Sequence, residues 1–274
     1  MKVKFWGVRG SIPTPWEEAM RVGGNTTCVQ ISPRDDMLMI LDAGTGLRLL
    51  GDHLVKSSAP LNGHLLLTHA HWDHIQGFPF FAPVYNPNNQ FTIYGADHAQ
   101  RTLEDIFRGQ MTAPYFPVEF AQAGAKLTFR SLAEETFLIE DVQVTTCAFH
   151  HPGGVFGFRI EYAGQSIVFA TDMEYTEDNL DARLIDFAAD ADLLIYDSQY
   201  TPEEFAQKIG WGHSTHIAAA HLAKRANVKH LMLFHHDPSH SDQQLLQMEK
   251  EAQAIFASSQ LATEGLDIDL DLLP

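Results

Sequence analysis

The chain has 274 residues, 45% of them hydrophobic, and its formal net charge is −17 at pH 7. This length suffices for one large buried core or two modest ones, and the negative charge repels phosphate backbones at long range, which argues against long nucleic acids as partners. A small anionic substrate stays compatible with this charge if metal ions reverse the field locally.

The first half of the chain alternates short apolar runs with polar turns. Residues 1–7 alternate like a strand and lack the apolar core of a signal peptide, and no apolar run in the chain reaches membrane-spanning length. The turn at 42–46 could open a helix through Leu50, Asp97 could cap a helix through about Arg108, and 111–117 is expected to be a stiff aromatic loop. The strands expected in this half are 2–7, 27–31, 37–41, 64–67 and 91–94.

The second half repeats this rhythm, with strands followed by helical segments. No linker, charge run or low-complexity segment divides the chain, so we expect a single domain over residues 1–274. Two strand-rich halves, each with helices, predict two stacked sheets with helices on their outer faces. The expected strands are 126–129, 142–148, 156–162, 166–170, 193–196 and 230–234, and the expected helices are 179–188, 216–226 and 243–257.

Cysteine and histidine are used very differently. Cys28 and Cys147 lie far apart and suggest no disulfide framework, so we expect a cytoplasmic protein without a membrane partner. The 15 histidines, in contrast, stand mostly beside glycine, aspartate or another histidine. That placement directs attention to metal binding.

The densest group of ligand-type side chains follows the strand at 64–67. His69, His71, Asp73 and His74 fall within six positions at the end of an apolar strand, where α/β sheets usually place their ligands. His69 and His71 point to one side of an extended segment and can hold one ion, while Asp73 and His74 follow on a turn and can hold a second. Two metal ions roughly 3.5–4 Å apart activate water and stabilise a leaving oxygen.

Further ligands would have to come from later strand ends. The pair His150 and His151, then Asp172, then the pair His235 and His236 each follow an apolar strand. Asp172 could instead cap a helix, and either member of each histidine pair could be an exposed loop residue. Spacing alone leaves both pairs open, but together with the first cluster these residues favour coordination.

This ordered series of motifs resembles the metallo-β-lactamase superfamily over nearly the whole chain. The resemblance implies an α/β fold, a four-layer αββα sandwich of two mixed β-sheets. In ribonuclease Z-like members a ligand histidine precedes a Gly-aromatic pair by six residues, as His151 precedes Gly157 and Phe158, and the last ligand directly follows a strand, as His235 does. The implied ligands are His69, His71 and His151 on one ion, Asp73, His74 and His235 on the other, and Asp172 bridging.

A second resemblance concerns proton transfer. Gly212-His213-Ser214-Thr215 is similar to the Gly-His-Ser-Thr segment of ribonuclease Z-like enzymes, and Asp197 occupies the place of their acidic partner. This implies His213 as proton donor or oxyanion stabiliser, with Asp197 orienting its ring. The alternative is a helix N-cap near residue 216 and a strand-end turn.

The sequence also departs from ribonuclease Z. Only a short hairpin separates Phe158 from Asp172, which leaves no room for the long arm that those enzymes use to hold tRNA. The opening 6–13, the loop 23–26 and the segment 151–154 look like a bacterial subgroup close to small cyclic-phosphate phosphodiesterases. Flavin-linked diiron proteins carry a glutamate where His71 stands, true β-lactamases lack a bridging aspartate, and the glutathione-binding tail of glyoxalase II has no match here.

We therefore expect a dinuclear hydrolase of a small phosphodiester, such as a cyclic nucleotide or a cyclic sugar phosphate. A metal-bound hydroxide held near Asp172 and Asp73 would attack phosphorus, and His213 would protonate the leaving alkoxide. The alternatives are a thioester or lactone hydrolase on the same metals and a metal-bound sensor without turnover. Zinc is the expected metal, although manganese and iron accept the same ligands, and a homodimer is left open. The aromatic residues that could wall the pocket, or simply pack in the core, are Phe80, Phe81, Tyr115 and Phe116.

Overall fold

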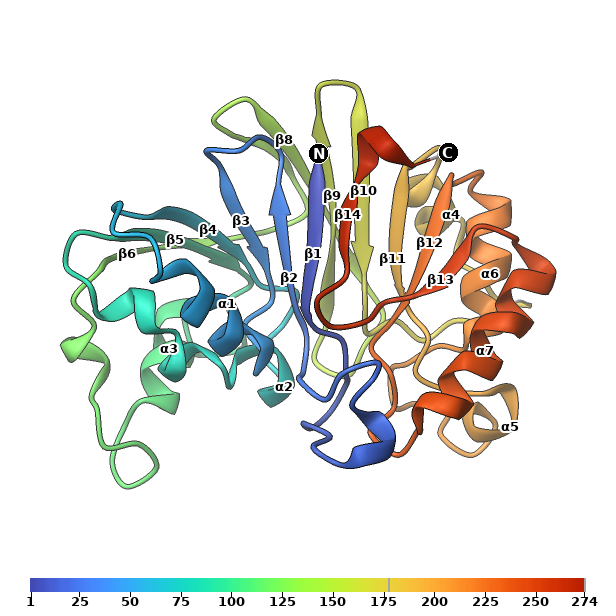
Figure 1. The fold of residues 1–274 in the computed structure, drawn as a ribbon, viewed down its shortest axis with the longest axis horizontal. Coiled ribbons are helices and arrows are strands. Elements are labelled where there is room, and N and C mark those ends of the chain that lie inside the picture. The colour runs from blue at the N-terminus through green and yellow to red at the C-terminus, as the bar shows by residue number, and fades with distance from the viewer. Residues whose placement is uncertain (177, 274) are drawn as a thin grey trace.

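The computed structural model describes residues 1–176 and 178–273, and within these ranges the strands form two seven-stranded sheets (Figure 1). The first sheet has the order β14-β1-β2-β3-β4-β5-β6, antiparallel from β14 to β3 and parallel from β3 to β6. Its strands are β1 (Lys2–Gly7), β2 (Cys28–Ser32), β3 (Leu38–Leu41), β4 (Asn62–Leu66), β5 (Gln90–Gly95), β6 (Lys126–Ser131) and β14 (Asp267–Asp269).

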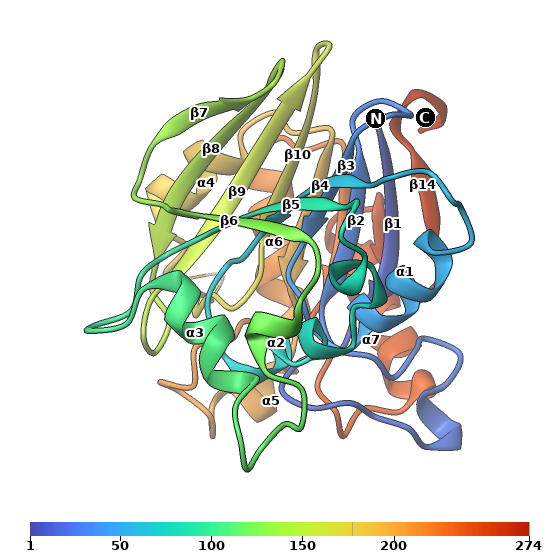
Figure 2. The same ribbon diagram turned by 90° about the vertical axis from the view of Figure 1, so that its left-hand side faces the viewer.

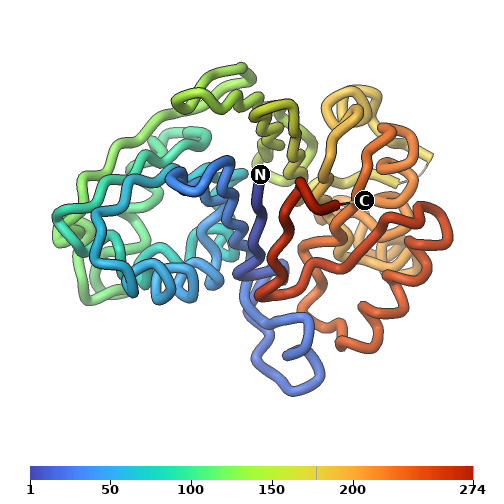
Figure 3. Tube along the Cα trace, turned by 45° about the horizontal axis from the view of Figure 1, so that its top comes forward, coloured from blue at the N-terminus to red at the C-terminus, as the bar shows by residue number. Residues whose placement is uncertain are grey.

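The second sheet has the order β13-β12-β11-β10-β9-β8-β7 and the same design, antiparallel from β7 to β10 and parallel from β10 to β13. Its strands are β7 (Thr136–Ile139), β8 (Val142–Phe149), β9 (Val155–Tyr162), β10 (Gln165–Ala170), β11 (Leu193–Asp197), β12 (His230–Phe234) and β13 (Ser259–Leu261). The strand β14, near the end of the chain, returns to pair with the first strand, β1 (Figure 3).

Helices cover the outer faces of both sheets. The helices are α1 (Gly46–Leu54), α2 (Trp72–Ile75), α3 (Leu103–Gln110), α4 (Ala182–Ala188), α5 (Pro202–Phe205), α6 (His216–Arg225) and α7 (Asp242–Ile255). Figure 2 shows α1, α2 and α3 gathered toward the lower edge of the first sheet, with α4 and α6 behind the strands of the second. None of the described helices is long and apolar enough to cross a lipid bilayer.

The main core lies between the sheets. Alternation in β1 turns Val3 and Phe5 inward, and the Phe5 ring packs against Phe234 of β12 at 6.1 Å between centroids. Phe234 also packs edge-to-face on Phe169 of β10 at 5.5 Å. Burial of each such phenylalanine stabilises the fold by about 1.5–3 kcal/mol. The predicted four-layer αββα sandwich is confirmed.

The boundaries of some elements differ from those expected. The helix expected from Asp97 begins at Leu103, because Thr102 and Asp105 form a reciprocal capping box, while Asp97 accepts a hydrogen bond from the Leu103 amide (2.7 Å). The helix expected from residue 179 begins after its N-cap, Asp181. The strands β7, β13 and β14 and the short helix α5 were not predicted, because segments of three or four residues carry too little periodicity.

Candidate metal centre

The carboxyl ends of β4, β10, β11 and β12 meet at the lower edge of the sheets in Figure 1, and the predicted ligands lie there. After β4 the chain stays extended through His71 and then turns into α2, which carries Asp73 and His74 in its single turn. This change from extended to helical backbone directs four ligand-type side chains toward one centre. His69, Asp73 and His74 are buried.

Three imidazoles form the first group. His151 Nε2 lies 3.1 Å from His71 Nδ1, and the His69 ring lies 4.4 Å from that of His71 and 4.7 Å from that of His151. His151 Nδ1 donates to the carbonyl of Gly212 (2.9 Å), which fixes Nε2 toward the other two rings. Its neighbour His150 is exposed and stays outside the group. The structure therefore places His151, as preferred from the resemblance, among the three.

Asp73, His74 and His235 form the second group. Asp73 Oδ2 lies 3.4 Å from His74 Nε2 and 3.2 Å from His235 Nε2, and the two rings stack at 5.3 Å. His236, although fully buried, turns the other way and donates from Nε2 to the carbonyl of Ala262 (3.0 Å). Of this pair, His235 is the one that the fold brings to the centre.

Asp172 lies between the two groups and is 2% exposed. Its Oδ1 is 3.9 Å from His69 Nε2 and 4.0 Å from His151 Nε2, while its Oδ2 is 3.3 Å from His74 Nε2 and 3.4 Å from His235 Nε2. One carboxylate thus presents a different oxygen to each group, and does not cap a helix.

Burial and local charges set different protonation states in the two ligand groups. Burial opposes ionisation of Asp172, but the imidazoles of His235 and His74 outweigh it and hold the pKa of this carboxyl well below its usual range. Burial lowers the pKa of His69 and brings that of His151 to about 4. Burial opposes protonation of His74 and His235 as well, but Asp172 and Asp73 outweigh it, so the pKa of His74 is raised and that of His235 reaches about 9. The centre therefore combines ionised carboxylates with neutral imidazoles at His69 and His151, whereas a metal ion has to displace a proton from His74 and His235.

The residues present fit a transition-metal cation. His69 Nε2 and His74 Nε2 are buried without a hydrogen-bond partner among the described residues, although both face the centre. A buried polar atom left unpaired costs about 1–3 kcal/mol, which a metal ion would offset by accepting the lone pair. Imidazole nitrogen with carboxylate oxygen is a donor set typical of zinc and related metals.

Asp42 is a residue of this centre that sequence reasoning missed. Its Oδ2 accepts from His74 Nδ1 (2.8 Å) and its Oδ1 accepts from the amide of Thr68 (2.9 Å). A carboxylate behind a ligand histidine fixes its tautomer and orientation. Like Asp172 and His235, which also follow strand ends, Asp42 has a left-handed backbone, with φ 61°. The signal available in the sequence was that a carboxylate, Asp42, directly follows the apolar run 37–41.

His213 and Asp197 form a dyad beside the centre. His213 Nδ1 donates to Asp197 Oδ2 (3.0 Å), and Asp197 also accepts from the amides of Asp172 (3.1 Å) and Ser214 (2.9 Å). Gly212 has φ 88°, and a Cβ there would lie 2.2 Å from His151 Nδ1, so only glycine lets the dyad approach the ligand group. The N-cap of α6 is Thr215, so His213 does not serve as the cap.

Two polar residues complete the surroundings and carried no sequence signal. Gln199 Oε1 accepts from His235 Nδ1 (3.2 Å), and the amide of Ser11 donates to Asp73 Oδ2 (2.7 Å). Gln199 Nε2 donates in turn to Ser11 Oγ (3.2 Å). The segment after β1 is thereby tied to the segment after β11 across the centre.

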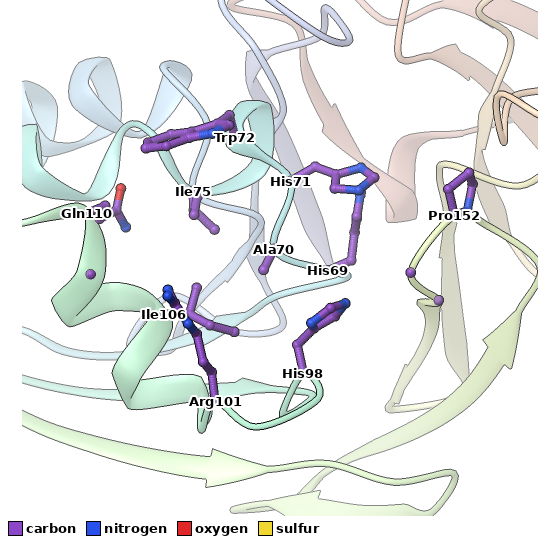
Figure 4. A pocket seen from close by; sticks show the side chains of 13 residues that line it. His69, Ala70, His71, Trp72, Ile75, His98, Arg101, Ile106, Gln110 and Pro152 are labelled. Atoms are coloured by element: carbon purple, nitrogen blue, oxygen red, sulfur yellow. The ribbon is translucent and has the colours of Figure 1, made fainter.

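A cavity of about 400 Å³ opens beside His69 and His71 (Figure 4). None of the four aromatic residues that could have walled the pocket lines this cavity, and the alternative of core packing holds for Phe81. Phe81 is buried against Phe91 at 5.3 Å, Phe80 packs edge-on against Phe116 at 5.5 Å, and Tyr115 is 82% exposed. The wall is formed instead by Trp72 and by side chains of α3.

Comparison with known proteins agrees with this geometry. The model of the family described as a beta-lactamase superfamily domain matches residues 39–236. Ribonuclease Z from Prochlorococcus marinus (strain NATL1A) is 23% identical over 330 aligned positions, which cover 99% of each chain.

Solved structures show the same fold. The metallo-beta-lactamase fold protein YhfI from Bacillus subtilis has a TM-score of 0.74 at 20% identity, covering 97% of this chain and 98% of that one. A diphosphatase from the PhnP family has a TM-score of 0.71 at 16% identity, covering 98% and 97%. Because the family match extends over more than half of its length, the chain belongs to the beta-lactamase superfamily, as a hydrolase of the metallo-β-lactamase fold.

Proposed function

We propose that the chain is a phosphodiesterase that holds two divalent transition-metal ions, with zinc as the expected metal. The observation that carries the proposal is the position of Asp172, whose two oxygens face two separate ligand groups. In this assignment Asp172 would contact both ions. One ion would be held by His69, His71 and His151, and the other by Asp73, His74 and His235.

Bound there, two such ions would activate water and neutralise charge on the phosphoryl oxygens. The protein itself supplies orientation and a proton. Asp73 is held by the amide of Ser11, and Asp197 fixes His213 in the tautomer that keeps Nε2 available for proton transfer. His213 lines the surface opening above Asp172, so it can reach a leaving alkoxide and protonate it.

Several features favour a small substrate. Ribonuclease Z from Prochlorococcus aligns over 330 positions with a chain of 274 residues, so at least 56 positions have no counterpart here. The strands β9 and β10 are joined by a tight turn in which Tyr162 pairs with Gln165, without an arm. The net charge of −17 also disfavours a polyanionic RNA. We infer a small phosphodiester as the substrate.

Both ligand groups draw on both sheets, which supports treating residues 1–274 as one domain. We place the protein in the cytoplasm, because Cys28 and Cys147 are free. The test combines metal analysis with a substrate panel of bis-p-nitrophenyl phosphate, a cyclic nucleotide, a thioester and a lactone. We expect close to two metal ions per chain and turnover of the phosphodiesters. A stoichiometry that never exceeds one after reconstitution would contradict the dinuclear assignment. If the thioester or the lactone is hydrolysed faster than the phosphodiesters, the chain is a thioester or lactone hydrolase instead. If no compound is turned over, a metal-bound sensor is favoured.

A further inference from the structure

The cavity beside the ligand groups has a second wall that metal binding does not explain. On one side of His69 and His71 the cavity is lined by a mixed apolar and polar wall, and Pro152 lies on the other side (Figure 4). The residues of this wall are Trp72, Ile75, Arg101, Ile106 and Gln110. Trp72 is 67% exposed, and the two isoleucines border the same space. A flat aromatic surface with aliphatic neighbours accepts a planar ring.

Gln110 is the unexplained residue in this wall. It ends α3 and is 8% exposed, yet neither its amide nitrogen nor its amide oxygen has a hydrogen-bond partner among the described residues. An unpaired buried amide disfavours folding, so its place at a cavity indicates that a ligand supplies the missing donor and acceptor. Glutamine offers the two atoms side by side, a pair that matches the adjacent acceptor and donor on the edge of adenine.

Arg101 supplies a positive charge at the same cavity. Reciprocal backbone hydrogen bonds join His98 and Arg101 (3.0 and 2.9 Å), and this tight turn brings both side chains to the wall. The guanidinium forms no ion pair with a carboxylate in the described part of the chain. In a chain of net charge −17, an unpaired cation beside the ligand groups attracts an anionic substrate whatever its base.

We propose that Trp72 and Gln110 form a nucleobase subsite, so that the substrate is a nucleotide rather than a sugar phosphate. The base stacks on Trp72, its edge hydrogen-bonds with Gln110, and Arg101 contributes attraction for the anion. This assignment rests on the proposed function, because the phosphodiester is taken to lie at the ligand groups next to the cavity. The cavity volume of about 400 Å³ falls in the range of small-molecule sites, about 300–1,000 Å³.

Binding without turnover tests the subsite. Calorimetric titration of the full chain, reconstituted with zinc, compares AMP with ribose 5-phosphate, which carries the same phosphate but no base. We expect AMP to bind about 10-fold more tightly or better, as for a bidentate amide–base pair. Equal affinities, or failure of both compounds to bind at millimolar concentration, would overturn the proposal.

The variant Gln110→Met removes both polar atoms and keeps the length of the side chain. We expect it to abolish the preference for AMP, to leave the affinity for ribose 5-phosphate unchanged, and to keep or raise Tm, because no paired amide is lost. The matched control is Gln122→Met, since Gln122 Oε1 accepts from the Glu119 amide (2.9 Å) outside the cavity. That control should lower Tm and leave both affinities unchanged.

Arg101→Met separates the effect of charge from base recognition, because it should lower the affinities for AMP and for ribose 5-phosphate by the same factor. If Gln110→Met also weakens both equally, or lowers Tm as the control does, the amide has another role and the subsite is wrong. The outcomes are separable from those of the proposed function. Selective AMP binding without any phosphodiester turnover would contradict the phosphodiesterase assignment and support the subsite. Phosphodiester turnover with equal affinities for AMP and ribose 5-phosphate would support the enzyme and contradict the subsite.

Discussion

The two halves of the molecule share one design but use it differently. In each sheet antiparallel strands give way to parallel ones, at β3 in the first half and at β10 in the second, and an aspartate with left-handed backbone follows each of these strands. Asp42, after β3, lies behind His74 and orients it, whereas Asp172, after β10, faces both ligand groups. The same position in the fold thus supports a ligand in one half and, in our assignment, becomes a ligand in the other.

The distribution of the predicted ligands also differs. The first half gathers His69, His71, Asp73 and His74 in one turn after β4, while the second half places one ligand each after β8, β10 and β12. A concentrated turn can be read from local spacing. Residues dispersed over 151–235 become neighbours only when the parallel strands bring their carboxyl ends to one edge.

The largest expected effect comes from making the same substitution at Asp172 and at Asp42 and comparing the loss of metal binding. Asp172→Asn and Asp42→Asn make the same chemical change at the same backbone conformation, which asparagine tolerates. Asp42→Asn should weaken metal binding about 10–100-fold, as for other partners of ligand histidines. Asp172→Asn should weaken metal binding more than about 100-fold and abolish turnover, because in our assignment it would remove the carboxylate that both ions share. Metal competition with a chelator and elemental analysis measure both, and equal losses would show that Asp172 is not a ligand.

A second, smaller effect separates metal binding from proton transfer within the second half. His213→Ala should retain the metals and slow an alkoxide leaving group about 10²–10⁴-fold, the usual worth of general-acid help. The loss should shrink for p-nitrophenolate, which departs without a proton. Asp197→Ala should follow the same pattern in milder form, since it acts through His213.

Steady-state rates with both leaving groups, together with metal content, measure this effect. Loss of a metal from His213→Ala, or equal slowing of both leaving groups, would make His213 a ligand or a phosphate-binding residue instead of the acid.

How much the sequence alone could predict follows the same division. The turn at His69–His74 was evident from residue types and spacing, and the two stacked sheets followed from the order of strands and helices, whereas their mixed character was implied only by the family resemblance. The choice of His151 over His150 needed a resemblance, because adjacent residues at a strand end differ only in which way the turn directs them. Gln110 and Gln199 could not be predicted, since a glutamine on a helix or in a loop is normally solvated, and only the fold shows that these two are buried.

The smallest expected effect uses the histidine pair after β12. Burial, with the Arg9 charge nearby, lowers the pKa of His236 to about 3, whereas an unfolded chain has it near 6.5. The unfolded state therefore binds more protons below pH 6.5, so the stabilisation is complete above that pH and is lost as pH falls toward 3. Between pH 7.5 and pH 5 this costs about 2 kcal/mol of unfolding free energy.

The variant His236→Gln tests this pH dependence, because glutamine keeps a donor for the carbonyl of Ala262 but cannot titrate. Urea unfolding at both pH values should show the wild type losing about 2 kcal/mol more than His236→Gln, with similar stability at pH 7.5. If both proteins lose the same free energy of unfolding, His236 accepts a proton in the folded state at an ordinary pH. His236 would then not be the buried, neutral member of the pair that the structure shows.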